Sequence, residues 1–297
     1  MKTLIVITGP TGVGKTGAAV KIAKELGADI ISADSRQIYR DIPIGTAAPT
    51  AEEMAEVHHH FVGIFGLEQY YSAAQFEEDV MNLLSQLFSN NEYVVMCGGS
   101  MRYVDAVCKG IDAIPTISDS VRNRIAELYA SEGIEGIKAI LQKHDPKYYS
   151  IVDLNNTKRI IHAIEICEEA GVPYSSLRTG QKKARPFRIV KIGLNMPRPD
   201  LFDRINHRVD VMMNLGLEAE ARRVLPLRHL NSLNTVGFKE MFAYFDGLMD
   251  FTTARERIKK NTRVYAKKQL TWFAKDDEIL WMTPDELINT DISSILR

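Results

Sequence analysis

Residues 4–16 read LIVITGPTGVGKT, which joins a short apolar run to a glycine-rich turn. Residues 4–7 are apolar and mostly β-branched, a pattern typical of a buried strand. The turn has the spacing Gly-x-x-x-x-Gly-Lys-Thr of a phosphate-binding loop, which ends at the N-terminus of a helix. The sequence therefore predicts a strand, a phosphate loop and a helix, and a ligand that carries a di- or triphosphate.

The predicted phosphate site consists of Gly9, Pro10, Thr11, Gly12, Val13, Gly14, Lys15 and Thr16. Its glycines allow backbone N–H groups to turn inward and surround phosphate oxygens. Lys15 supplies a positive charge for the terminal phosphates, and the Thr16 hydroxyl is placed to hold Mg²⁺. The alternative is a glycine-rich turn that binds nothing, but the strand–turn–helix context favours the phosphate site.

The composition limits the class of protein. The chain has 297 residues, 45% of them hydrophobic, and a net charge of −1, so it can form one large or two modest domains, and any charge signal must be local. Its three cysteines lack metal-ligand spacing, which favours reduced thiols. The first strand leaves no room for a signal peptide, and no apolar stretch is long enough to span a bilayer. We expect a cytoplasmic protein.

The hydrophobic pattern predicts an α/β fold, a parallel sheet flanked by helices like that of P-loop NTPases. The expected strands cover residues 4–7, 28–33, 93–97, 187–194 and 279–282. Residues 119–170 show helical periodicity only. We therefore expect an inserted all-helical subdomain at residues 113–183, between the two parts of the core, residues 1–112 and 184–297.

Polar residues follow two of the expected strands, at the edge where open α/β sheets bind ligands. Asp34 is a candidate general base, because a carboxylate beside a phosphate repels the ligand unless it takes a proton or holds a metal. A helix N-cap is the alternative. Ser100 follows Gly98 and Gly99, which suggests close backbone approach to a ligand with a hydroxyl donor beside it; a plain turn is the alternative.

Basic residues form two further patterns. Arg204 and Arg208 fall four apart on one helix face and suggest a diphosphate clamp, with a solvated face as the alternative. Residues 251–275 carry a stripe of basic residues at every fourth position, which includes Lys259, Arg263 and Lys267. Such a stripe on a near-neutral protein indicates a polyanion, unless it is a solvated face.

Three adjacent histidines occur at residues 58–60. Three neighbours cannot all face one metal from a regular element, and no acid or cysteine lies at ligand spacing along the chain. We therefore expect a surface or cleft-lining segment here and no metal site.

The ordered set of motifs resembles one known family, the tRNA dimethylallyltransferases or isopentenyltransferases. The phosphate loop alone occurs in many nucleotide hydrolases, but the ordered set is specific and covers nearly the whole chain. The motifs are GPTGVGKT (residues 9–16), ISADSRQIY (31–39), IGTAAP (44–49), YSAAQF (71–76), GGSMRY (98–103), NTKRIIHAIEI (156–166), RINHRVDVM (204–212), VGFKEM (236–241) and TRVYAKKQLTWF (262–273).

This resemblance implies the transfer of a dimethylallyl group from dimethylallyl diphosphate to N6 of the adenosine immediately 3′ of the tRNA anticodon. On that basis the phosphate loop holds the prenyl diphosphate, with Mg²⁺ near Thr16. Asp34 then takes the proton from N6, and either Arg204 or Arg208 contacts the diphosphate. Ser100 stands where the family usually has threonine, so the hydroxyl is kept without its methyl group.

The resemblance also implies that the partner is the anticodon stem-loop of tRNA, and we expect a monomer of the bacterial type. The residues that match tRNA contacts of the family are Asp34, Ser35, Arg36, Gln37, Ser100, Arg122, Lys158, Arg159, Ile160, Ile161 and His162. The basic stripe adds Lys259, Arg263 and Lys267 from the charge pattern alone.

Two other classes of function remain open. A small-molecule kinase of the phosphate-loop class requires ATP-specific turnover and lid arginines on the insertion. An NTP-gated RNA-binding module would bind tRNA without changing its mass. The expected strand at residues 93–97 ends without the Mg²⁺-linked acid of many phosphate-loop ATPases, which weakens the nucleotide-hydrolase interpretation.

Overall fold

The computed structural model describes residues 1–297 and separates into two compact units. The core unit comprises Met1–Cys108 and Ala184–Arg297, and the insertion unit comprises Lys109–Lys183. The sequence predicts the insertion from residue 113, four residues later than the structure places it. The last residue of α5 (Met101–Lys109) is the first residue of the insertion unit, so the segment that follows this helix already belongs to the insertion.

The core unit contains one six-stranded sheet with the order β3-β2-β4-β1-β5-β6, and every neighbouring pair is parallel. The strands are β1 (Thr3–Thr8), β2 (Ile30–Ser32), β3 (His59–His60), β4 (Tyr93–Cys97), β5 (Arg188–Leu194) and β6 (Ile279–Met282). The sequence predicts five of these. It misses β3, because a two-residue edge strand is too short to show periodicity.

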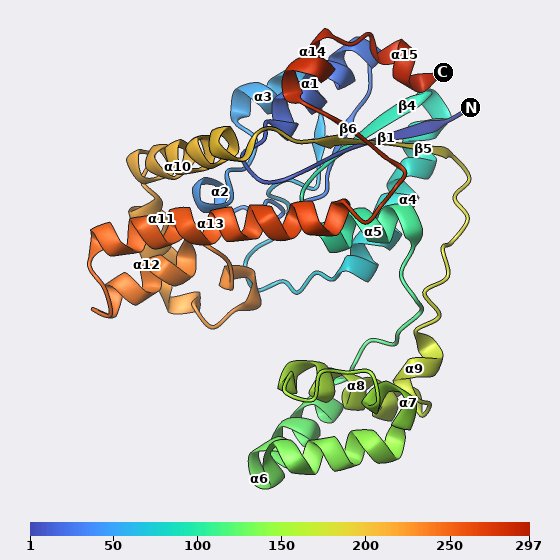
Figure 1. Ribbon diagram of the computed structural model, residues 1–297, viewed down its shortest axis with the longest axis vertical. Helices are drawn as coiled ribbons and strands as arrows, with labels where there is room; N and C mark the ends of the chain where they lie inside the picture. Colours follow the sequence, from blue (N-terminus) through green and yellow to red (C-terminus); the bar gives the residue numbers. More distant parts are fainter. The chain divides into compact units, whose positions relative to one another are not determined.

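Helices cover both faces of the sheet (Figure 1). Successive residues of a strand point to opposite faces, so Ile5 and Ile7 of β1 belong to one hydrophobic cluster and Leu4 and Val6 to another. The helices of the core are α1 (Lys15–Leu26), α2 (Pro43–Thr46), α3 (Ala51–Glu56), α4 (Ala73–Asn90), α5, α10 (Arg198–Asn214), α11 (Leu217–Val224), α12 (Phe238–Phe245), α13 (Phe251–Phe273), α14 (Pro284–Asn289) and α15 (Ile292–Leu296), with 3₁₀ turns at Leu225–Leu227 and Asn231–Leu233.

Two helix ends follow the sequence closely. α4 begins with a capping box: the Ser72 hydroxyl accepts a hydrogen bond from the Gln75 N–H, and the Gln75 side chain accepts one from the Ser72 N–H. α1 begins after Gly14, whose φ of 103° lies in the left-handed region that favours glycine. The phosphate loop therefore leads directly into the N-terminus of α1.

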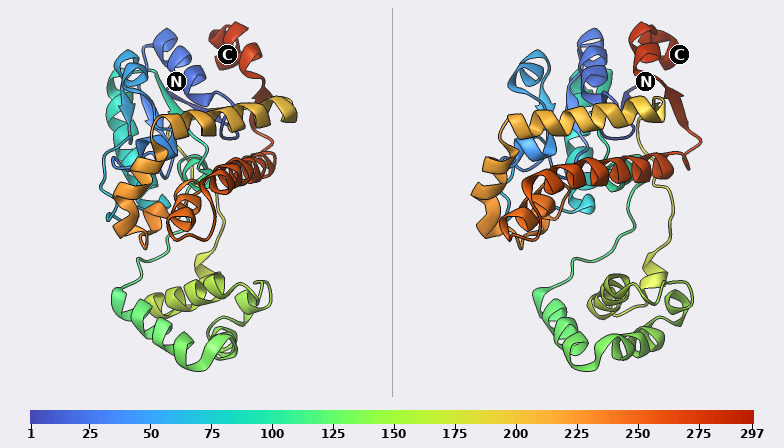
Figure 2. Two further views of the ribbon diagram at one scale, coloured as in Figure 1. Left: turned by 90° about the vertical axis from the view of Figure 1, so that its left-hand side faces the viewer. Right: turned by 60° about the vertical axis from the view of Figure 1, so that its left-hand side comes forward.

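The long helices α10 and α13 lie side by side in the core unit (Figures 1 and 2). Together with α11 and α12 they enclose a third hydrophobic cluster, which includes Leu217, Phe238 and Ile258. α13 also contributes Ala266 to the cluster on one face of the sheet and Phe273 to the cluster on the other. This packing fixes α13 against the rest of the core.

The insertion unit contains no strand, as predicted. Its helices are α6 (Asp119–His144), α7 (Pro146–Tyr149), α8 (Thr157–Ala170) and α9 (Tyr174–Leu177). Gly133, with a φ of 66°, interrupts α6. The unit has a hydrophobic core of its own, formed mainly by Ile125, Leu141, Ile160 and Ile164, which are fully buried. No helix of the protein has both the length and the apolar character needed to cross a membrane.

Candidate active site at the phosphate loop

The phosphate loop connects β1 to α1 and holds a half-buried lysine. The Lys15 ammonium donates a hydrogen bond to the Pro10 carbonyl at 2.9 Å, which folds the side chain back over the loop. Burial lowers the pKa of Lys15 to about 8, and the nearby Arg208 acts in the same direction. An ammonium without a full counter-charge favours an anion as its partner, so this loop is suited to bind phosphate groups.

Gln269 of α13 is a residue of the site that the sequence does not single out. Its side chain is almost completely buried and reaches two backbone segments of the site. The Oε1 atom accepts a hydrogen bond from the Thr11 N–H at 2.8 Å, and Nε2 donates one to the Gly99 carbonyl at 2.8 Å. A Cβ at Gly99 would lie 2.3 Å from Gln269 Nε2, which explains why this position is glycine.

Asp34 follows β2 and forms a cap of the kind that the sequence considers as the alternative to a general base. Its Oδ1 atom accepts hydrogen bonds from the N–H groups of Arg36 at 2.9 Å and Gln37 at 3.3 Å. This is a cap, although the capped segment is a turn and not the predicted helix. The second carboxylate oxygen takes part in neither bond and can accept a proton or a metal at the site.

Ser100 positions the same segment from the neighbouring strand. It lies between β4 and α5, is buried, and accepts a hydrogen bond from the Ser35 N–H at 2.8 Å. Its hydroxyl also donates to Ser35 Oγ at 3.2 Å. These bonds connect the end of β4 to the residue that follows Asp34, so Ser100 helps to hold the carboxylate in place.

The two candidate arginines differ in their surroundings. The Arg208 guanidinium donates to the Thr11 hydroxyl at 3.1 Å. Burial lowers the pKa of Arg208, and Asp34 opposes this effect. Arg204 is exposed, and its guanidinium lies 3.4 Å from the position that a Cβ would take at Gly14. Both arginines therefore reach the phosphate loop, but only Arg208 is anchored to it.

Two cavities meet at this edge of the sheet. The loop cavity, about 430 Å³, is lined by Lys15, Thr16 and Arg204 among others. The large cavity, about 560 Å³, is lined by Ser100, Arg36 and Lys268 among others. The residues that line both are Thr11, Asp34, Thr46, Arg208 and Tyr265. A carboxylate and a guanidinium thus stand where a phosphate-bearing ligand in one cavity would meet a second ligand in the other.

Tyr265 is a further residue of the site that the sequence misses, because its helical position predicts a core side chain. It is 36% exposed and lines both cavities. Burial raises the pKa of Tyr265 to about 12, and the nearby Asp34 adds to this effect. Burial likewise raises the pKa of the Cys97 thiol to about 12, so the thiol beside Lys15 remains protonated and is not a nucleophile.

The residues after Asp34 divide into two groups. Ser35 and Arg36 line the large cavity, and their contact with tRNA remains a prediction. Gln37 lines the loop cavity instead, and its amide is engaged within the protein. Its Nε2 donates to the Ala47 carbonyl at 3.0 Å, and its Oε1 accepts from Ser32 Oγ at 3.3 Å. The side chain of Gln37 thus connects Ser32 to Ala47, and its contact with tRNA remains a prediction.

Two residues of the predicted basic stripe on α13, Lys259 and Arg263, face α10, so the polyanion contact expected for Lys259 is wrong. The Lys259 side chain is 11% exposed, and its ammonium lies 2.8 Å from Asp210 and 3.2 Å from Glu256. Arg263 donates to the Asn206 side chain of α10. The error arose because the acidic partner Asp210 lies on a neighbouring helix, where the pattern of α13 alone cannot show it.

Other basic residues of α13 are exposed. Lys267 remains accessible, and its ammonium lies 5.5 Å from the centre of the Phe202 ring. Arg257, Lys260 and Lys268 are exposed, and Lys268 also lines the large cavity. These side chains can meet a phosphate backbone, and they replace Lys259 and Arg263 as the candidates.

The residues of the insertion unit that match tRNA contacts of the family differ in their burial. Ile160 is fully buried, so its side chain cannot contact RNA, and Ile161 is partly buried against the same cluster. Both point inward because α8 needs an apolar face for its own core. The remaining predicted residues of the unit, which are all exposed, are Arg122, Lys158, Arg159 and His162.

The parallel sheet, the phosphate loop and the cavity beside it define a protein of the phosphate-loop class with room for a second ligand. Comparison with known proteins narrows this class. The family described as IPP transferase matches residues 37–276. The chain belongs to the IPP transferase family.

Individual relatives agree with this assignment. The chain is 57% identical to tRNA dimethylallyltransferase 2 of Parabacteroides distasonis over 286 residues, 96% of each chain. It is 54% identical to tRNA dimethylallyltransferase 1 of Bacteroides thetaiotaomicron over 297 residues, which are 100% of this chain and 96% of the relative.

Solved structures agree as well. The full-length tRNA isopentenylpyrophosphate transferase of Bacillus halodurans superposes with a TM-score of 0.71 at 34% identity, covering 100% of this chain and 94% of that one. A eukaryotic dimethylallyltransferase acting on tRNA superposes with a TM-score of 0.84 at 25% identity, covering 99% of this chain and 77% of that one. The family resemblance inferred from the sequence is confirmed.

Proposed function

We propose that this protein transfers a dimethylallyl group from dimethylallyl diphosphate to N6 of the adenosine immediately 3′ of the anticodon of tRNA. The observation that carries the proposal is the position of Asp34 and Arg208, which line both cavities. The loop cavity suits the diphosphate, and the large cavity suits the adenosine. The atoms that react would then meet between the two side chains.

Negative charge develops on the leaving diphosphate as the allylic C–O bond breaks, and the site must stabilise this charge. Lys15, the backbone N–H groups of the loop and the Arg208 guanidinium are the donors on the loop side. Arg208 is fixed by its bond to Thr11, and Thr11 is fixed by Gln269. Donors that are already in place need little rearrangement when the charge develops, which favours ionisation of the donor substrate.

The adenosine amine is a weak nucleophile, because its lone pair is delocalised into the ring. Asp34 Oδ2 is the group that accepts the proton from N6 as the new C–N bond forms. The cap at Oδ1 and the bonds from Ser100 to Ser35 hold the carboxylate in one orientation. To reach this oxygen, the adenosine must leave the base stack of the anticodon loop and enter the large cavity.

A divalent cation fits the loop cavity by the chemistry of its lining. The Thr16 hydroxyl and the carboxylates of Asp34 and Glu53 are oxygen donors, which Mg²⁺ prefers. We propose that Thr16 holds Mg²⁺ together with the diphosphate. Bound there, the cation would offset the negative charge of the leaving group.

The polyanionic partner is proposed to be the anticodon stem-loop. The exposed basic face of α13, formed by Arg257, Lys260 and Lys268, offers phosphate contacts on the core unit. On the insertion unit, Lys158 and Arg159 are exposed at the start of α8. These contacts would fix the RNA without reading its sequence.

A transfer assay tests the proposal directly. Labelled dimethylallyl diphosphate and unmodified tRNA are incubated with the protein, and label in the RNA and released diphosphate are both counted. We expect equal amounts of the two products. A parallel reaction with ATP and no prenyl donor tests the kinase alternative, which predicts ATP turnover in this reaction and no label in tRNA in the first one. An RNA-binding module would retain tRNA and give neither product.

A further inference from the structure

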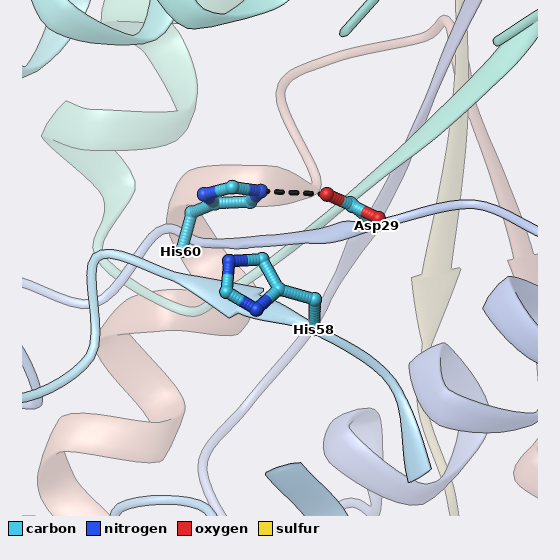
Figure 3. A group of neighbouring side chains, drawn as sticks. All are labelled: Asp29, His58 and His60. Carbon is cyan, nitrogen blue, oxygen red and sulfur yellow. Dashed lines mark hydrogen bonds and ion pairs between the residues drawn. The ribbon is translucent and has the colours of Figure 1, made fainter. Parts of the chain in front are cut away.

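A cluster of possible metal ligands lies at the edge of the sheet, at the end of β2 opposite Asp34 (Figure 3). It consists of Asp29, His58 and His60, and one ligand atom from each lies within 4.8 Å of the others. His60 Nε2 and Asp29 Oδ2 are 2.8 Å apart. The rings of His58 and His60 meet edge to face, with centroids 4.3 Å apart. None of these three residues takes part in the site described above.

The backbone explains why two of the three histidines share a side. Successive side chains of a strand point to opposite faces, so the first and third residues of a three-residue run face the same way. His59 points to the other face, where its Nδ1 lies 2.9 Å from the Val57 carbonyl. Pairing of β3 with β2 then brings Asp29, which precedes β2, next to the pair. The expectation of no metal site considered all three histidines together and overlooked this arrangement.

We propose that Asp29, His58 and His60 form a binding site for a divalent transition cation, with Zn²⁺ as the best match. Two imidazole nitrogens and one carboxylate oxygen are a donor set that zinc accepts, with a water molecule in the fourth position. Mg²⁺ prefers oxygen donors only, so this site differs in chemistry from the one near Thr16. Zinc would take the place of the proton between His60 and Asp29.

The geometry needs only a small adjustment to accept the ion. Donor atoms about 2.1 Å from a tetrahedral zinc lie about 3.4 Å from each other. The His60–Asp29 pair is already closer than this, and the widest separation in the cluster is 4.8 Å. His58 is exposed, so its ring can rotate toward the other two ligands at little cost.

The site would connect an edge strand to the segment that carries the candidate base. The chain that follows β3 runs beside the Asp34 turn: Gly63 N–H donates to the Gln37 carbonyl at 2.9 Å, and Phe65 N–H donates to the Ile38 carbonyl at 3.1 Å. A metal that holds His60 to Asp29 fixes the start of this supporting segment. We therefore expect zinc to stabilise the fold, with a smaller effect on the reaction itself.

The test is a zinc titration of the full chain without a histidine tag, after removal of metals with a chelator. Calorimetry in buffer with excess Mg²⁺ measures affinity and stoichiometry, and Co²⁺ absorption reports the nitrogen and oxygen ligands. The variants are His58→Ala and Asp29→Asn, and the matched control is His229→Ala, which removes an exposed histidine elsewhere. Thermal unfolding with and without zinc is the second readout.

We expect one equivalent of Zn²⁺ to bind the wild type and the His229→Ala control, with a rise in the unfolding temperature. Binding should weaken by at least about tenfold in both ligand variants, and the rise should disappear. His58→Ala alters an exposed side chain, so it gives a result even if Asp29→Asn fails to fold. No binding to the wild type, or equal binding to His58→Ala and the wild type, would overturn the proposal.

Discussion

The Gln269 side chain joins Thr11 of the phosphate loop to Gly99 at the end of β4, with both hydrogen bonds at 2.8 Å. One amide thus fixes the two backbone segments that border the loop cavity. Gln269 also lines the loop cavity, but both polar atoms of its amide bind backbone groups, so we assign it a positioning role. Its position on α13 also makes this helix part of the site.

Replacing Gln269 by leucine leaves the Thr11 N–H and the Gly99 carbonyl without their partner. We expect the free energy of unfolding to fall by about 1–3 kcal/mol and kcat/KM for the prenyl donor to fall at least tenfold, roughly the effect of removing one or more buried hydrogen bonds. Denaturant unfolding and steady-state kinetics measure the two effects. Gln269→Glu, which keeps the acceptor and removes the donor, should be intermediate in activity; full activity of Gln269→Leu would contradict the positioning role.

The variant Asp34→Asn removes the proposed general base and keeps the cap, because asparagine retains the oxygen that accepts hydrogen bonds from the N–H groups of Arg36 and Gln37. We expect kcat to fall about 10²–10⁴-fold, the usual contribution of a general base, with tRNA affinity close to that of the wild type. Single-turnover transfer and a filter-binding assay measure these quantities. A large loss of tRNA affinity would instead make Asp34 a structural residue.

Arg208 is hydrogen-bonded to the phosphate loop and Arg204 is not, so their replacement should have different effects. Arg208→Lys removes the fixed guanidinium bond to Thr11, so we expect kcat/KM for the donor to fall about 10²-fold or more. Arg204→Lys keeps a flexible cation over the loop at an exposed position and should cost less. Kinetics of both variants with the same donor give the comparison. A larger effect at Arg204 would reverse the assignment.

Lys15 predicts a pH dependence for anion binding. Since its pKa is lowered to about 8, the ammonium is charged below that pH and becomes neutral as the pH rises through it. The affinity of the free enzyme for inorganic pyrophosphate should therefore fall between pH 7.5 and 9, a range of roughly one unit about that pKa, and binding above pH 8 should take up a proton. Calorimetry in buffers of different ionisation enthalpy measures both. If the pyrophosphate affinity of the wild type does not change with pH, or if Lys15→Met shows the same affinities as the wild type, Lys15 does not contribute to anion binding.

The exposed face of α13 predicts salt-dependent RNA binding. Arg257→Ala combined with Lys260→Ala should weaken tRNA binding and reduce the slope of log K against log salt by about one for each phosphate that is no longer neutralised. Lys259→Ala is the matched control from the same helix. Because Lys259 is paired with Asp210, its removal should lower thermal stability and leave the slope unchanged. If Lys259→Ala reduced the salt slope and the Arg257→Ala, Lys260→Ala variant did not, the stripe that contains Lys259 would be the RNA-binding face.

The local features of the site could be predicted from the sequence. The phosphate loop, the carboxylate after β2 and the hydroxyl after β4 are each defined by a few consecutive residues and by the direction of the strand before them. The parallel sheet places their ends together, so Asp34 and Ser100 could be assigned to one edge. Their contribution to the reaction remains a prediction, as does the monomeric state.

The features that were missed depend on contacts between distant residues. Gln269 and Thr11 are 258 positions apart, and nothing within α13 marks the glutamine as buried in a site. The pairing of Lys259 with Asp210 and the approach of Asp29 to His60 likewise depend on how two elements pack. Helical periodicity also could not show which side of α13 would face α10, so it could not place Tyr265 in the site.

The mass of an unmodified tRNA after incubation with the protein, Mg²⁺ and dimethylallyl diphosphate tests the central claim most directly. The tRNA must carry adenosine 3′ of its anticodon. We predict a gain of one dimethylallyl group at that nucleoside with the wild type and no gain with Asp34→Asn. An unchanged mass with the wild type, together with hydrolysis of ATP or phosphorylation of a small molecule, would contradict the account.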